Sequence, residues 1–304
     1  MSKHILTVLR YFSHFSYAPS FDEIYTFFPQ KISKKNLRIL LGNEAQKGRI
    51  LRIRKKNAIA TYGPSPGSNM PYSLSPHPFL YTLPQYSILL AKSEKLKAQS
   101  SIQKMLIKLQ RYFSFLRVIP LIRFVGITGA SALQGVREND DVDLCIVARN
   151  GSLWTTRFIV IILAKLLGIH GGMGVCLNLF FDETDLAIRP KKQNSYIAHE
   201  LLQMKSVIDK NNLYAGFIAQ NKWIASYYPN AFVHSSKLKV KSQKVEESSH
   251  YPLHPLPHAL ESLLKSLQLI LIRRNKVLFY ISPTQLWLFK NDYEKILKRR
   301  GLVL

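Results

Sequence analysis

Residues 124–147, FVGITGASALQGVRENDDVDLCIV, decide the fold of the surrounding chain. The apolar run at the start of this stretch predicts a short buried strand, and the small residues 128–131 predict a tight turn after it. Asp141 and Asp143 then open a second apolar run, which predicts a second strand. Because alternate side chains of a strand share a face, we expect the two carboxylates to project together.

This arrangement favours particular ligands. Two carboxylates on one strand face repel each other unless a cation lies between them, and hard oxygen ligands suit Mg2+ or Mn2+. The turn formed by Gly129, Ala130 and Ser131 lets backbone N–H groups approach an anion closely. A metal and a phosphate side by side indicate phosphoryl chemistry on a nucleotide.

The stretch resembles the nucleotidyltransferase superfamily, which has the polymerase-beta-like fold. Its signature is a Gly-Ser or Gly-Gly turn, a short spacer, and Asp-hydrophobic-Asp on the next strand. Gly129 matches the turn, Ala130 departs from the usual Ser or Gly, and Ser131 supplies a hydroxyl one position later. Asp141 and Asp143 match the metal ligands. The resemblance implies an α/β (α+β) fold, with a mixed-sheet core flanked by helices, and a nucleoside triphosphate as substrate.

The family usually carries a third acidic residue on the following strand, which we predict at residues 175–181. The best-placed residue here is Asn178, whose amide oxygen can bind a metal but cannot act as a base. Asp182 follows at the end of the strand and is the alternative ligand. This departure leaves open whether the site transfers a nucleotide or only binds one.

Two further residues are candidates for the site. Arg157, one turn into a predicted helix, can reach a phosphate or form a structural ion pair. His199 is a weaker candidate for the catalytic base. It stands beside Glu200 in the helix predicted for residues 194–205, where adjacent side chains point in different directions and form no catalytic pair by themselves.

Residues 1–63 predict three helices followed by a basic hairpin with strands at 50–54 and 58–62, the order of a winged helix-turn-helix. Its third helix and wing are where such a fold contacts a duplex. The candidate nucleic-acid-binding residues there are Lys34, Lys35, Arg38, Arg52, Arg54, Lys55 and Lys56. A winged helix that contacts protein, or braces a neighbouring domain, is the open alternative.

The rest of the chain divides by composition. Residues 64–84 are rich in proline and predict a linker, residues 85–236 the core, and residues 237–258 a polar loop. Residues 259–304 predict a helical tail, with a short extended piece at 277–281. Residues 194–205, 221–224 and 228–230 resemble a group of bacterial and archaeal nucleotidyltransferase-domain proteins. That group joins a winged-helix-like N-terminus to this core and a helical tail.

Composition bounds the partners and the compartment. The chain has 304 residues and a net charge of +25, which favours anionic partners such as nucleotides or nucleic acid, unless the charge is simply spread over a solvated surface. We expect no membrane-spanning segment and no secretion signal. Cys145 and Cys176 predict buried thiols in a reducing cytoplasm. The oligomeric state is not indicated.

Two functions follow from these observations. The first is Mg2+-dependent transfer of a nucleoside monophosphate from a triphosphate to an acceptor hydroxyl that the sequence does not identify. The second is a weak or inactive form of the same fold that binds nucleotide or DNA as a regulatory module, and an antitoxin-like partner role is a further possibility.

Overall fold

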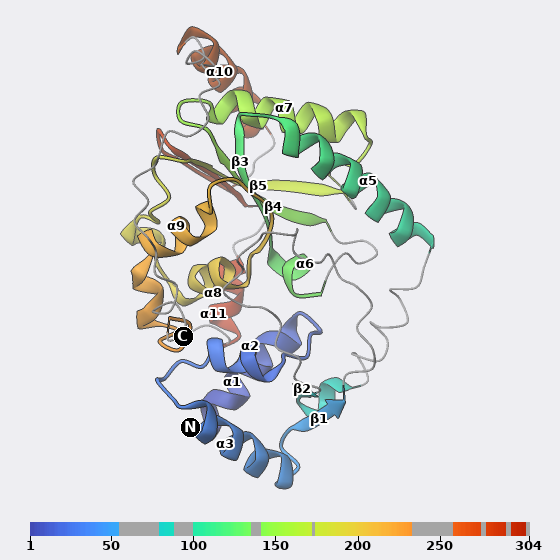
Figure 1. Cartoon of the computed structure of the whole chain (residues 1–304), viewed down its shortest axis with the longest axis vertical. Helices are drawn as coiled ribbons and strands as arrows, with labels where there is room; N and C mark the ends of the chain where they lie inside the picture. Colours follow the sequence, from blue (N-terminus) through green and yellow to red (C-terminus); the bar gives the residue numbers. More distant parts are fainter. Residues whose placement is uncertain are drawn as a thin grey trace.

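The computed structural model is an α/β protein with a mixed sheet flanked by helices (Figure 1). Within the part of the chain that it describes, no helix is both long and apolar enough to cross a bilayer. The described residues are 1–54, 79–87, 100–134, 141–171, 174–232, 258–274, 278–289 and 293–301.

The central sheet contains six of the described strands, in the order β6-β3-β4-β5-β8-β7. Strands β4 and β5 run parallel, and the other neighbouring pairs are antiparallel. The two strands predicted from residues 124–147 are β3 and β4, and they pair with each other inside the sheet. The strand bounds are β3 (Ile122–Thr128), β4 (Val142–Ala148), β5 (Val175–Asp182), β6 (Lys205–Asp209), β7 (Leu278–Ile281) and β8 (Gln285–Phe289).

Both faces of this sheet are covered (Figure 1). Leu144 and Ile146 of β4 belong to a core shared with the helices of one face, whereas Cys145 and Val147 belong to the core of the other face. The first face carries α5 (Ser100–Val118), α7 (Leu153–Leu166) and α10 (His258–Arg274). The second face carries α8 (Ser195–Gln203) and α9 (Leu213–Gln220), with α6 (Gly129–Gln134) and α11 (Tyr293–Arg299) nearby.

The C-terminal range contains two strands, of which only the extended piece at 277–281 was predicted, and this corrects the helical tail predicted for residues 259–304. Between α10 and α11, strands β7 and β8 form a hairpin that pairs with β5 and extends the sheet. Leu286 and Leu288 enter the core of one face, and Trp287 enters that of the other. Such a short, continuous apolar run cannot be assigned to strand or helix from its periodicity alone.

The N-terminal part contains three helices and a two-stranded antiparallel sheet. Its helices are α1 (Ser2–His14), α2 (Phe21–Thr26) and α3 (Lys34–Gln46), and its strands are β1 (Leu51–Arg54) and β2 (Phe79–Thr82). The described partner of β1 therefore lies inside the range predicted as a linker. Residues 58–62, predicted as the second hairpin strand, lie outside the described residues.

The N-terminal helices do not form a separate core. Leu9 and Phe12 of α1 belong to the same apolar cluster as Leu201 of α8 and Trp287 of β8. Asn230 connects the chain after α9 to the segment between α2 and α3. Its side chain accepts from the N–H of Ile32 at 3.0 Å and donates to the carbonyl oxygens of Phe28 and Gln30. Residues 1–54 thus pack against the α8 face of the sheet as one body with it.

Candidate functional site

The glycine turn and the acidic strand meet at one end of the sheet. Thr128, the last residue of β3, lies opposite Asp143 of β4 in the strand register. Gly129 follows with φ of +64°, and a Cβ added there would collide with Oδ2 of Asp143. Only glycine satisfies both conditions, because a side chain is strained at this φ and has no room beside the carboxylate.

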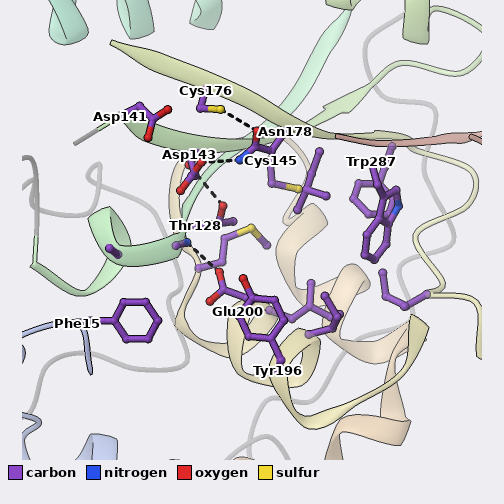
Figure 2. A pocket seen from close by; sticks show the side chains of 18 of the residues that line it. Phe15, Thr128, Asp141, Asp143, Cys145, Cys176, Asn178, Tyr196, Glu200 and Trp287 are labelled. Carbon is purple, nitrogen blue, oxygen red and sulfur yellow. Dashed lines mark hydrogen bonds between the residues drawn. The ribbon is translucent and has the colours of Figure 1, made fainter. Parts of the chain in front are cut away.

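Asp141 and Asp143 line the same pocket, which has a volume of about 350 Å3 (Figure 2). Both side chains are half-buried, while Val142 and Leu144 are buried in the core of the other face. The predicted alternation along β4 is therefore present. Two carboxylates facing one pocket fit a Mg2+ ion that arrives with substrate phosphates, the way this ion is commonly bound.

A bulge in β5 shapes the opposite wall of the pocket. Leu144 is paired with Leu177, but the next residue of β4, Cys145, is paired with Leu179. Asn178 is the extra residue, so Asn178 and Leu179 both line the pocket although they are adjacent in sequence. Bulges re-aim side chains in this way, often beside functional sites.

Asn178 is placed beside the acids, as predicted. Its Nδ2 donates a hydrogen bond of 2.5 Å to Oδ1 of Asp143, and its Oδ1 accepts from Sγ of Cys176 at 2.8 Å. Cys176 is half-buried and lines the pocket, so the prediction of a buried thiol holds for Cys145 only. The amide compensates part of the Asp143 charge without a cation.

Ser131 and Ala130 differ in their roles. The hydroxyl of Ser131 donates to the backbone carbonyl of Asp141 at 3.1 Å. This buried side chain thus holds the backbone at Asp141 against the start of α6. Ala130 lines the pocket with Gly129.

Glu200 is the site residue that sequence reasoning missed. Its Oε2 accepts from the N–H of Gly129 at 2.8 Å, and its Oε1 accepts from Nε2 of Gln203 at 2.6 Å. Burial raises the pKa of Glu200 to about 8; these two hydrogen bonds oppose the shift, and the Asp143 charge adds to it. The backbone N–H of Gly129, which was expected to bind a phosphate, thus donates to the carboxylate of Glu200 instead.

A signal for Glu200 is present in the sequence. The side chain of Asn194 accepts from the N–H of Ile197 and so fixes where α8 begins. Counted from that cap, Tyr196, Glu200 and Gln203 lie at i, i+4 and i+7 on one helix face, and the first two line the pocket. A row of polar side chains on a mostly apolar helix is typical of a helix that lines a cavity, and equally typical of a helix with one solvent-exposed face.

The remaining walls of the pocket are mostly apolar. They include the tip of α1 and the residues after it, which close one side (Figure 2). No lysine or arginine occurs among the described lining residues. The apolar and aromatic members include Phe15, Leu179, Phe181, Ile188, Tyr196, Met204 and Trp287.

Two predicted ligands lie elsewhere. Asp182 is at the far end of β5, where its carboxylate accepts from the N–H groups of Gly151 at 2.7 Å and Thr184 at 3.0 Å. Arg157 is on α7, across the sheet, and its Nη1 donates to Oε1 of Gln268 at 2.6 Å. The strand direction separates Asp182 from Asp143, and the sheet separates Arg157 from the pocket, so neither belongs to the site.

His199 lies behind the pocket wall, against the N-terminal helices. Its ring stacks on Phe27, with centroids 3.8 Å apart, and lies 4.0 Å from the ring of Tyr11. Burial lowers the pKa of His199 to about 3, against a smaller opposing effect of Gln203. His199 is therefore a neutral packing residue that joins α8 to α1 and α2, and it does not line the pocket with Asp143.

Two of the predicted nucleic-acid-binding residues come together on the N-terminal surface. The guanidinium of Arg38 lies 5.0 Å from the ring of Phe21, and that of Arg52 lies 4.1 Å from the ring of Phe79. Both positive charges act on Tyr81. Burial raises the pKa of Tyr81, and the charges of Arg52 and Arg38 lower it. Residues of α3 and β1 thus place charge around one aromatic side chain.

The other predicted basic residues are placed separately. Lys34 forms a 2.9 Å ion pair with Asp22 and is partly committed to the fold. Lys35 and Arg54 are exposed, and Lys55 and Lys56 lie outside the described residues.

The described residues contain no group of three or more histidine, cysteine, aspartate or glutamate side chains placed to hold a metal ion. Glu200 therefore does not complete a metal site with Asp141 and Asp143, and any ion there would take its remaining ligands from substrate and water. Comparison with family models, curated proteins and solved structures finds no match to this chain.

Proposed function

We propose that the protein is a nucleotidyltransferase that moves a nucleoside monophosphate from a triphosphate to an acceptor hydroxyl. The observation that carries this proposal is that Asp141 and Asp143 face one pocket directly beside the Gly129 turn. Asp143 is held there by Asn178, and Asp141 by its position one residue before β4. The carboxylate of Asp143 is thus oriented by a hydrogen bond within the protein.

The chain supplies position and electrostatics to this reaction. Asp141 and Asp143 orient the bound triphosphate; Mg2+, when bound, neutralises phosphate charge. The acceptor oxygen bonds to the α-phosphorus, the bond to pyrophosphate breaks, and the hydroxyl proton is lost to solvent. The apolar walls limit water that would compete with the acceptor.

The experiment is incubation of the protein with labelled nucleoside triphosphates, Mg2+ and cell lysate. We expect pyrophosphate release and label on one acceptor class, both abolished in Asp141→Asn and Asp143→Asn. Asp22→Asn, which removes a carboxylate of α2 outside the pocket, is the matched control and keeps full activity. Transfer that survives both pocket substitutions contradicts the proposal.

A second candidate is nucleic-acid binding by the N-terminal surface, alone or beside a weak transferase site. It is favoured by Arg38 and Arg52 converging near Tyr81, and by Asn178 standing where the superfamily that the sequence resembles has an acid. We expect duplex affinity to fall steeply with salt, and the Arg38→Ala/Arg52→Ala variant to reduce the salt slope by about 2. Lys108→Ala on α5 is the control, and no binding at low salt excludes this candidate.

A further inference from the structure

Glu200 has no cationic partner among the described residues. Its two oxygens accept from neutral donors, the backbone N–H of Gly129 and the amide of Gln203. Asp143 of β4 adds a like charge near Glu200. A carboxylate in a partly desolvated pocket is disfavoured without a compensating positive charge, and the hydrogen-bond partners of Glu200 do not supply one.

The pocket around Glu200 admits a ligand of limited size and of one charge type. Its volume of about 350 Å3 is at the lower end of small-molecule sites. Three acidic side chains and no described lysine or arginine line it, so an anionic ligand without bound metal meets like charge there.

The other end of the pocket suits an apolar body. Figure 2 shows Glu200 and Tyr196 on the α8 side, Asp143 and Asn178 on the sheet side, and Trp287 at the end away from Asp141. Trp287, Phe181 and Leu179 line this end, and Trp287 and Phe181 are almost fully buried. Aromatic walls of this kind bind flat or aliphatic groups and also attract cations.

We propose that the part of the pocket between Glu200 and Trp287, which we call the acceptor half, binds a small amine. The ammonium of this amine lies on Glu200, and its aromatic or aliphatic body lies against Trp287. The name "acceptor half" rests on the proposed nucleotidyl transfer, but the binding itself does not. The ammonium supplies the missing counter-charge for Glu200. Asp141 and Asp143 act on the nucleotide from the sheet side of the pocket, across from the α8 side that carries Glu200.

The test uses three probes of one shape, without nucleotide or metal: 2-phenylethylamine, 2-phenylethanol and 3-phenylpropionate. Calorimetry on the full chain is expected to give the amine a Kd about tenfold or more below that of the alcohol, and no binding of the acid. Glu200→Gln is expected to bring the amine to the level of the alcohol. Trp287→Leu is expected to weaken amine and alcohol alike, and Asp22→Asn to change neither.

Equal affinity for the amine and the alcohol, an amine preference that persists in Glu200→Gln, or no binding of any probe overturns the inference. Circular dichroism and melting curves of each variant establish that it folds, and the shared Trp287→Leu loss locates the probes in the pocket. Amine selectivity in a protein that transfers no nucleotide removes only the proposed reaction. Mg2+-dependent transfer without amine selectivity removes only this inference.

Discussion

The side-chain amide of Asn178 donates a hydrogen bond to the carboxylate of Asp143 across two parallel strands. An aspartate at this position would instead place two like charges together and require a cation between them. The amide therefore lets the acidic end of the sheet fold without a metal ion. It also means that any ion bound there has two protein carboxylates, not three.

The substitution Asn178→Asp tests this reading. Without divalent metal we expect the variant to be less stable by about 1–3 kcal/mol, because it replaces a hydrogen bond by a repulsion. Mn2+ is expected to restore the loss and to bind at least about tenfold more tightly than to the unsubstituted protein. Denaturation with and without Mn2+ measures both effects. Asn178→Ala is the control, and rescue of that variant by Mn2+ speaks against the charge argument.

The glycine turn gives a prediction with a built-in comparison. Gly129 and Gly151 have almost the same φ, +64° and +66°, but an added Cβ meets Asp143 only at Gly129 and open space at Gly151. Gly151→Ala is expected to lose about 1 kcal/mol from backbone strain alone. Gly129→Ala is expected to lose about 1–3 kcal/mol more and to abolish transfer, since Asp143 must move. Equal losses at the two glycines would show that Asp143 is free to move aside.

Glu200 makes stability depend on pH. Its pKa is about 8 in the folded protein and 4.5 as the ordinary value, so the folded state binds more protons between these values. The stabilisation from this proton is complete below pH 4.5 and is lost as the pH rises through 8, by up to about 1.4 kcal/mol per pH unit.

Urea unfolding at several pH values measures the difference in stability between the unsubstituted protein and Glu200→Gln. We expect the stability of the unsubstituted protein to fall, relative to that of Glu200→Gln, from pH 5 to pH 9. A difference that stays constant over this range means that Glu200 is already ionised at pH 5.

Asn230 is expected to control the N-terminal packing. Asn230→Ala leaves the N–H of Ile32 and the carbonyls of Phe28 and Gln30 without their side-chain partner, and we expect a loss of about 2–4 kcal/mol. Because residues 14–16 close one side of the pocket, probe and nucleotide affinity should fall with it. Asn36→Ala, at an exposed position of α3, is the control in both assays. Unchanged hydrogen exchange in α1 contradicts this role.

The parts of the site that follow local rules were predictable. The apolar–small–acidic pattern of residues 124–147 specifies two strands and the turn between them, and the period of two puts Asp141 and Asp143 on one face. Asn178 was found because it lies in the next apolar run. These features depend on neighbours in sequence, whose geometry the backbone fixes.

The parts that depend on long-range packing were not predictable. Strand β8 joins β5 from more than 100 residues away, and it carries Trp287 into the pocket. The bulge at Asn178 depends on the register with β4, and the contact of Glu200 depends on how α8 docks on the turn. The role of Arg157 stayed open between a phosphate contact and a structural one, because the sequence does not say which face of the sheet its helix covers.

The most direct measurement of the central claim is calorimetric binding of a nucleoside triphosphate analogue whose α,β-bridge is a methylene group and cannot be cleaved. We predict binding in Mg2+ that disappears in chelator and weakens about tenfold or more in both Asp141→Asn and Asp143→Asn. Affinity that is the same with chelator, or unaffected by either substitution, contradicts a metal–nucleotide site at this pair of carboxylates.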